Sequence, residues 1–187
     1  MPGDAAFHIK WPTVPACYGW LSLDRRGGWR LKGEIVRHPG LVAYLNRNYA
    51  PDLAGNWVVS NGPQRVFVGL DYTPLVWRFV EGSLFSNPGQ VTPEVQSVFL
   101  DETGNVLIAC KEGIGLLDDR ELADFVLECC NVSGGMAAHD DVLAGLTGSA
   151  ELFWRGLRLQ NIASTDVASK FGFNPMPSPE FQAQLPS

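Results

Sequence analysis

The alternation of apolar and polar residues predicts a series of β-hairpins in the first half of the chain. Residues 18–35 alternate on both sides of residues 24–28, as two strands joined by a glycine-containing turn do. Residues 57–61 and 64–70 alternate around a Gly-Pro pair and predict a second hairpin. Residues 75–80 follow as a further apolar strand.

Two stretches change to the period of an α-helix. Apolar residues recur at helical spacing after Pro39, a residue suited to the first helical position, and this helix is expected to end near Asn48. A second helix is predicted over residues 118–130, where Asp118 and Glu121 have the spacing of a capping box.

The second half of the chain repeats the order of the first. Leu100-Asp101 aligns with Leu23-Asp24 at an offset of 77 residues (101 minus 24), and each pair precedes a glycine turn, a strand and then a helix. The chain is therefore interpreted as an α+β protein with mostly antiparallel sheets, two packed helices and an internally duplicated hairpin-helix unit. Its expected parts are a first repeat at 1–90, a second repeat at 91–173 and a proline-rich tail at 174–187.

The rest of the second repeat gives weaker patterns. A short helical stretch is expected at 140–147, and residues 150–162 are interpreted as one strand bent at Gly156. Gly113 and Gly115 lie between a predicted strand and a predicted helix, where a phosphate loop would stand. The acidic residues at the helix start disfavour a phosphate, so a flexible turn is the preferred interpretation.

Composition and charge narrow the classes of partner. Hydrophobic residues make up 45% of the chain and charged residues 18%, which predicts a buried core. The net charge of -6 argues against nucleic-acid binding, because phosphate contacts need a basic face. Neither a membrane-spanning run nor a secretory signal is recognisable in the sequence, so a cytoplasmic protein is expected.

The cysteines and acidic clusters give no metal or cofactor motif. The four Cys residues lack paired CxxC spacing and are interpreted as buried small hydrophobes, with Cys129 and Cys130 on the second helix. The run His139-Asp140-Asp141 is interpreted as a helix start rather than a metal site. No metal and no cofactor is therefore expected.

The sequence does not favour an enzyme. The nucleophile-elbow, zinc-protease and phosphate-loop motifs are all missing. An enzyme remains open as a third hypothesis, through Cys17 or Cys110 acting with His38 or His139.

The segments GGWRLKGEIV and WVVSNGPQRVFVGLDYTPLV resemble a group of uncharacterised bacterial proteins. That resemblance implies a duplicated motif, a second half similar to pleckstrin-homology folds, a small-molecule site between the halves and a role in signalling. The residues that match are Gly28, Trp29, Gly33, Ile35, Trp57, Pro63, Val66, Val68, Asp71 and Pro74, and Phe85-Ser86-Asn87 resembles a further element of the pattern.

The first functional hypothesis is a noncatalytic ligand-sensing or regulatory module that binds a small anionic, nucleotide-like ligand near the interface of the two halves. Cationic side chains would pair with phosphate or carboxylate and an indole would stack on a ring. The predicted ligand residues are Trp29, Lys32, Arg65, Arg78, Ser86 and Asn87, with Arg37 and His38 at the start of the first helix as the alternative anion site. The alternative function is a protein-interaction or dimerisation module without a small-molecule pocket, with a second copy or another protein as partner.

Overall fold

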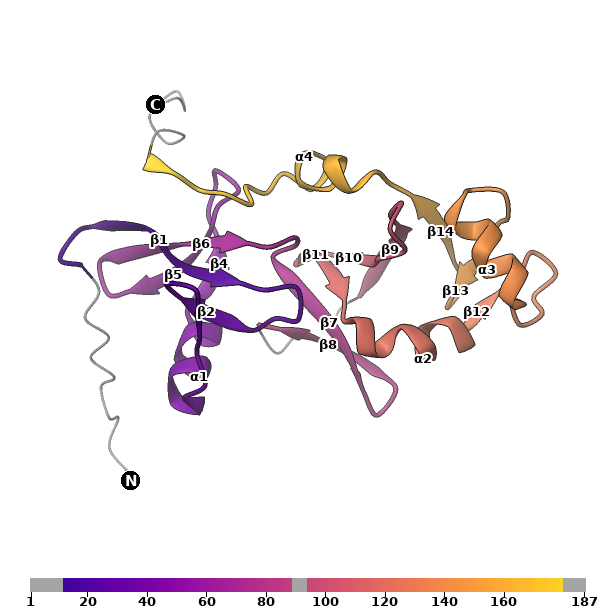
Figure 1. Ribbon diagram of the computed structural model, residues 1–187, viewed down its shortest axis with the longest axis horizontal. Coiled ribbons are helices and arrows are strands. Elements are labelled where there is room, and N and C mark those ends of the chain that lie inside the picture. The colour runs from indigo at the N-terminus through magenta and orange to yellow at the C-terminus, as the bar shows by residue number, and fades with distance from the viewer. Residues whose placement is uncertain (1–11, 89–93, 180–187) are drawn as a thin grey trace.

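The protein folds into two β-sheets that follow one another along the long axis of the molecule (Figure 1). The computed structural model describes residues 12–88 and 94–179. The first sheet contains β1 (Ala16–Leu23), β2 (Trp29–Leu31), β3 (Glu34–Ile35), β4 (Tyr49–Pro51), β5 (Trp57–Asn61) and β6 (Gln64–Leu70). The second contains β7 (Leu75–Val80), β8 (Ser83–Asn87), β9 (Val95–Leu100), β10 (Val106–Cys110), β11 (Gly113–Leu117), β12 (Cys129–Cys130), β13 (Phe153–Trp154) and β14 (Leu157–Asn161).

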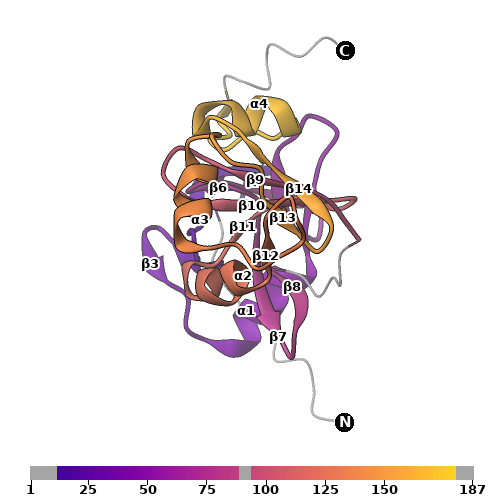
Figure 2. The ribbon, with the colours of Figure 1, turned by 90° about the vertical axis from the view of Figure 1, so that its right-hand side faces the viewer.

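Short helices lie around the sheets. They are α1 (Pro39–Arg47), η1 (Asp119–Glu121), α2 (Leu122–Leu127), α3 (His139–Leu146), η2 (Ser164–Asp166) and α4 (Val167–Phe171). Figure 2 shows α1 and α4 on opposite sides of the molecule. Most strand pairs are antiparallel, and the α+β class expected from the sequence is confirmed.

The strand order shows the internal duplication directly. The first sheet runs β3-β2-β1-β6-β5-β4, and six strands of the second run β11-β10-β9-β14-β13-β12. In each set the two central strands, β1 with β6 and β9 with β14, pair in parallel. A helix follows the third strand of each set, α1 in one and η1-α2 in the other. We call β1–β6 with α1 the first copy and β9–β14 with α2 the second copy.

Four turns repeat one hydrogen-bond pattern, two in each copy. An Asp or Asn side-chain oxygen accepts from the backbone N–H groups two and four residues later. The residue three positions after the Asp or Asn is a glycine with a positive φ, in the left-handed region. The turns begin at Asp24 and Asp52 in the first copy and at Asp101 and Asn131 in the second, at offsets of 77 and 79 residues (101 minus 24 and 131 minus 52). We name each turn by this first residue.

The copies differ by two additions. The second copy has α3 between the Asn131 turn and β13, where the first copy passes directly from the Asp52 turn to β5. The hairpin of β7 and β8 joins the second sheet, because β7 pairs in parallel with β11. Where the chain divides into repeats, near residue 90, stays a prediction.

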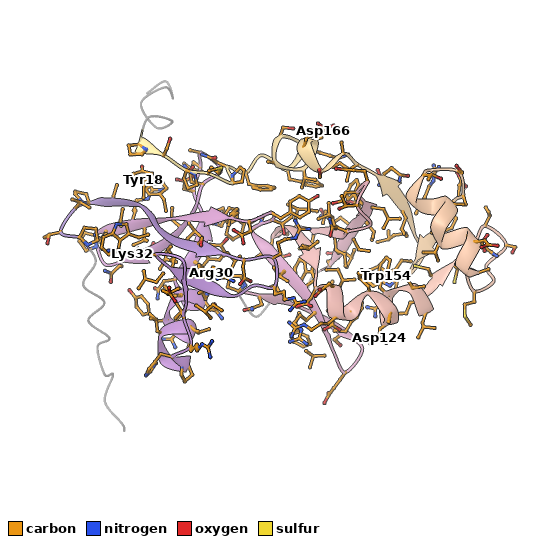
Figure 3. All side chains as sticks on the ribbon, in the orientation of Figure 1. Tyr18, Arg30, Lys32, Asp124, Trp154 and Asp166 are labelled. Carbon is orange, nitrogen blue, oxygen red and sulfur yellow. The ribbon has the colours of Figure 1, made fainter. Side chains whose placement is uncertain are left out.

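Large aromatic side chains fill the core at both sheets. Trp29, Trp77 and Trp154 are fully buried, and Figure 3 shows Trp154 inside the second copy. The indole N–H of Trp29 donates to Asn46 Oδ1 at 2.6 Å, and that of Trp77 donates to the Ile108 carbonyl at 2.9 Å. A side chain at Gly115 would collide with the Trp77 indole, so a glycine is needed there for β11 to pack.

Three local predictions are wrong. Gly113 and Gly115 lie in strand β11 rather than in a flexible turn. The second helix ends at Leu127, and Cys129 and Cys130 form strand β12, so these two cysteines are not helical. Residues 150–162 are not one bent strand but a hairpin of β13 and β14 that turns at Arg155 and Gly156.

The chain returns to the first copy after α4. The N–H of Asn174 donates to the Gly55 carbonyl at 2.9 Å, and the N–H of Leu70 donates to the Pro175 carbonyl at 2.8 Å. In Figure 1 this segment runs back over the second sheet to reach the first. The end of the second copy is thereby tied to the first.

Candidate anion pocket between the two copies

A cavity of about 240 Å³ lies where the Asp24 turn of the first copy meets the second copy. In Figure 1 the loop from β1 to β2 reaches toward the start of α2. Two arginines enter from the first copy, and the remaining walls come from β11, η1, α2 and the Asp101 turn. The lining residues are Arg25, Arg26, Asn105, Leu116, Leu117, Asp119 and Leu122.

The geometry of the Asp24 turn places both arginines at its tip. Asp24 Oδ1 accepts from the N–H groups of Arg26 at 3.0 Å and of Gly28 at 2.8 Å, which holds the backbone in a tight turn. The side-chain amide of Asn87 donates to the Gly27 carbonyl at 2.9 Å and fixes the turn to β8. The tip is therefore held from within and from the second sheet.

Arg26 makes an ion pair across the junction. Its Nε and Nη2 donate to Asp119 Oδ1 and Oδ2 at 3.1 and 2.7 Å, a bidentate geometry. Both side chains are more than half exposed, at 61% and 57%, so screening by solvent leaves the pair only weakly stabilising. This contact links the copies, but another anion can readily replace Asp119 as the partner of Arg26.

Arg25 has a different environment. Its guanidinium carbon lies 4.6 Å from the centre of the Tyr72 ring, a cation–π contact. Within residues 12–88 and 94–179 no carboxylate forms an ion pair with Arg25. Its position is supported by an aromatic ring while its charge lacks an ionic partner in the described chain.

The support beneath Arg25 is a buried hydrogen-bond network at Asp101. The hydroxyl of Tyr72 and the side-chain amide of Asn105 each donate to Asp101 Oδ2 at 2.7 Å. Burial alone raises the pKa of Asp101, but the hydrogen bonds from Asn105 and Tyr72 outweigh it and the net pKa is lowered. Burial, followed by the bond to Asp101, raises the pKa of Tyr72. Asp101 is therefore ionised and Tyr72 neutral at pH 7.

The η1 wall begins at a second buried carboxylate, Asp118. Arg120 donates to it through Nε at 2.8 Å, Nη2 at 2.5 Å and the backbone N–H at 3.0 Å. The side-chain bond from Arg120 is the main reason that the pKa of Asp118 falls to about 2. Asp118 thus fixes η1, and the next residue, Asp119, points to Arg26.

Three of the six predicted ligand residues lie on the β7–β8 hairpin and do not line this pocket: Arg78, Ser86 and Asn87. Asn87 holds the Asp24 turn, and Arg78 donates to the buried carboxylate of Glu121, in η1, at 3.1 Å. Ser86 is buried in β8 opposite Trp77.

The other three predicted ligand residues lie elsewhere. Trp29 is buried in the first copy, and Lys32 lies over the Trp20 ring with Nζ 3.5 Å from its centre, away from the second sheet (Figure 3). Arg65 forms an ion pair with Asp52. The structure thus separates the six residues, and their role in binding a ligand stays a prediction.

At the alternative anion site, His38 caps α1 with its own side chain. Nδ1 accepts from the N–H groups of Gly40 at 3.2 Å and Leu41 at 3.4 Å. These are N–H groups that an anion at the helix start would use. Arg37 is exposed beside it, and anion binding there also stays a prediction.

Sequence reasoning did not select Arg25 and Arg26 as ligand residues. The available signal was a pair of adjacent arginines at the tip of a predicted turn. Exposed arginines on a turn are common, so only the approach of the second copy distinguishes them.

Neither a metal centre nor a membrane span emerges from the described residues. No group of three or more His, Cys, Asp or Glu in residues 12–88 and 94–179 is arranged to hold a metal ion. Within the same ranges, every helix is too short or too polar to cross a bilayer.

Comparisons with known proteins relate the chain to families without an assigned activity. A crystal structure of a DUF1285 family protein from Silicibacter pomeroyi DSS-3 matches with a TM-score of 0.50 and 15% identity, over 70% of this chain and 79% of that one. A DUF1285 family protein from Shewanella baltica OS155 matches with a TM-score of 0.43 and 16% identity, over 58% of this chain and 91% of that one. At these identities the likeness to the Silicibacter protein concerns the fold alone. No curated protein matches the chain.

A family model described as "Protein of unknown function (DUF2946)" matches residues 4–178, which is nearly the whole chain. This agrees with the expectation of a family whose function is not assigned. The chain belongs to the DUF2944 family.

Proposed function

We propose that the protein is a noncatalytic sensing or regulatory module that binds a small anionic ligand in the pocket between its two copies. The observation that carries the proposal is Arg25, whose guanidinium is held over Tyr72 and has no ionic partner in the described chain. Arg26 adds a second guanidinium to the lining of the same pocket. Guanidinium pairs of this kind suit phosphate or carboxylate groups.

The size of the pocket limits the ligand group that enters. Its volume of about 240 Å³ is below the range of roughly 300–1,000 Å³ that is typical for drug-sized ligands. A phosphate or a small carboxylate fits within it. A nucleotide would place one phosphate there and keep its base outside.

Asp119 provides the coupling that a sensor needs. A bound anion competes with Asp119 for the N–H donors of Arg26, so the anion weakens an ion pair that joins the two copies. Because this pair is exposed, replacing it costs little energy. Binding of the anion thereby loosens the Arg26–Asp119 link between the copies, and a regulatory partner can detect the resulting change in structure.

Isothermal titration of the full chain with inorganic phosphate, pyrophosphate and AMP tests the proposal. We expect saturable binding of at least one of them, and Arg25→Ala weakens that binding by about tenfold or more, since a direct charge-assisted contact is lost. Asp119→Asn strengthens it, because the competing carboxylate is removed. Arg47→Ala, which removes an exposed arginine at the end of α1, leaves it unchanged.

Two results contradict the proposal for these ligands. One is the lack of saturable binding at millimolar concentration. The other is equal affinity in the Arg25→Ala and Arg47→Ala variants, which would mean that general positive charge rather than the pocket attracts the anion.

A further inference from the structure

The Asp52 turn of the first copy is covered by residues 171–175, which are the last residue of α4 and the segment that follows it. The N–H of Asn174 donates to the Gly55 carbonyl at 2.9 Å, and its side-chain amide donates to Asn56 Oδ1 at 3.0 Å. Asn174 and Asn56 form a parallel β-bridge. A Cβ added at Gly55 would lie 2.3 Å from the Gly172 carbonyl oxygen, so the segment packs directly on the turn.

The Asn131 turn is the equivalent of the Asp52 turn in the second copy, and it borders an open groove. The groove has a volume of about 580 Å³, and its described lining comes only from the end of α2, β12, the Asn131 turn and the β13–β14 hairpin. Four of its residues, Cys130, Asn131, Val132 and Gly134, correspond at an offset of 79 (131 minus 52) to Pro51, Asp52, Leu53 and Gly55, which line the covered surface of the first copy.

The aromatic residue on this face differs in burial between the copies. Trp57 pairs with Pro51 and is 7% exposed, within the cavity that Phe171 and Phe173 also line. Phe153 pairs with Cys130 in the same way but is only half-buried. Among the described residues, no segment lines this face of the second copy as Phe171 and Phe173 line that of the first.

Exposed apolar side chains gather around the open groove. Leu127, Val132 and Met136 are 66%, 71% and 70% exposed. Leu127 ends α2 just before β12, Val132 lines the groove, and Met136 forms a β-bridge with Cys130. Water-exposed apolar surface of this kind, beside a polar turn, is typical of an interaction site.

We propose that this groove binds an extended segment of a partner protein that contains an aromatic residue followed by Asn-Pro, in the manner of Phe173-Asn174-Pro175 on the first copy. The backbone N–H of the partner's Asn donates to the Gly134 carbonyl, as that of Asn174 donates to Gly55. The partner's aromatic side chain packs on Phe153 and Val132.

The residues of the groove determine which segments fit. Gly135 stands where the first copy has Asn56, so the side-chain bond made by Asn174 has no counterpart and backbone and aromatic contacts carry the affinity. Arg155 and Glu128 form a bidentate ion pair at 2.7 and 2.9 Å, which leaves the wall without net charge. A neutral, apolar segment is therefore preferred over an acidic or basic one.

A labelled synthetic peptide of residues 169–178, SKFGFNPMPS, is the probe for this site. In the full chain the first-copy site is held by its own segment at high effective concentration, so added peptide meets only the open groove. We expect a saturable rise in fluorescence anisotropy. A peptide with Ser at both Phe positions binds about tenfold more weakly or worse, because the aromatic contact is lost.

Two matched variants test whether the peptide binds in the groove. Val132→Asp weakens peptide binding by about tenfold or more, since a charge is set into an apolar contact. Leu53→Asp, at the equivalent position of the first copy, where the side chain is fully exposed, leaves binding unchanged. Peptide also slows alkylation of Cys130, the half-buried cysteine that lines the groove, whereas Cys17, Cys110 and Cys129 are buried and react slowly throughout.

Three outcomes overturn the proposal. They are the lack of saturable binding, equal affinity in the Val132→Asp and Leu53→Asp variants, and a dimer of the unmodified protein in light scattering that Val132→Asp converts to a monomer. The last would assign the groove to a second copy of the chain.

Discussion

Arg25 and Arg26 are consecutive in the chain, yet their guanidinium groups have different partners. Arg26 faces Asp119 across the junction, whereas Arg25 faces an aromatic ring. The sequence indicates a turn at this point but not which charges it presents to a pocket, because that depends on the approach of the second copy. Trp29 illustrates the reverse case. An aromatic residue on a strand is more often a core residue than a ligand platform, and burial places Trp29 in the core although it is a predicted ligand residue.

Asp118 gives a pH-dependent prediction at the residue scale. Its folded pKa of about 2 is below its ordinary value of 3.8, so its ionised form stabilises the fold above pH 4, and this contribution is lost as the pH falls from about 4 to 2. Asp118→Asn keeps a capping side chain but removes the charge, and it should lower the free energy of unfolding by about 1–2 kcal/mol at pH 7, allowing for the half-exposed Arg120.

Urea denaturation at pH 7, 5, 4 and 3 measures this effect. The difference between the natural protein and Asp118→Asn stays constant from pH 7 to 5 and narrows below pH 4. Asp71→Asn, at an exposed position, serves as the control and changes little. A difference that is independent of pH down to 3 would rule out the ionised Asp118 as its source.

At the scale of elements, long alternating patterns were predictable and short pieces were not. The hairpins around residues 24–28 and Gly62, strand β7 and helix α1 agree with the sequence pattern. Strand β12 has two residues, which is too short to show an alternating pattern. In the sequence, Cys129 lies at helical spacing from the apolar residues of α2, so the pattern extends the predicted helix over it. In the β13–β14 turn, Arg155 has a positive φ of 48°, which is uncommon for a residue other than glycine. The single glycine after it, Gly156, therefore suggests a bend in one strand rather than a turn between two.

Gly27 gives a prediction for the Asp24 turn. Its φ is 74°, and an added Cβ would lie 2.6 Å from the side-chain nitrogen of Asn87, the group that anchors the turn to β8. Gly62 also has a positive φ, 58°, but an added Cβ meets no atom within 4 Å. Gly62→Ala therefore reports backbone strain alone, about 1 kcal/mol, and Gly27→Ala should lower the free energy of unfolding by about 1 kcal/mol more.

Chemical denaturation of the two variants side by side measures this difference. Because Asn87 lies in β8 of the second sheet, the extra loss in Gly27→Ala reflects the link between the Asp24 turn and that sheet. Equal losses in both variants would mean that the bond from Asn87 contributes nothing to the stability of the turn.

At the scale of the whole molecule, duplication produces two related units whose surfaces are used differently. The first copy presents its Asp24 turn to the second copy and has its Asp52 turn covered by residues 171–175. In the second copy, Asn105 of the Asp101 turn lines the pocket that Arg25 and Arg26 enter, and no segment of residues 12–88 or 94–179 covers the Asn131 turn in the same way. Element order was visible in the sequence, whereas the packing that creates the pocket was not. The pleckstrin-homology-like character that the resemblance implies for the second half stays a prediction.

The central claim is that an anion binds between the copies at Arg25 and Arg26. The most direct measurement is a phosphate titration of ¹⁵N-arginine-labelled protein, followed by the Nε–H resonances in NMR spectra. The account predicts saturable shifts of the Arg25 and Arg26 resonances with one common dissociation constant, while Arg47 and Arg158 stay unshifted. Saturable shifts confined to other arginines, or none at all, would contradict it.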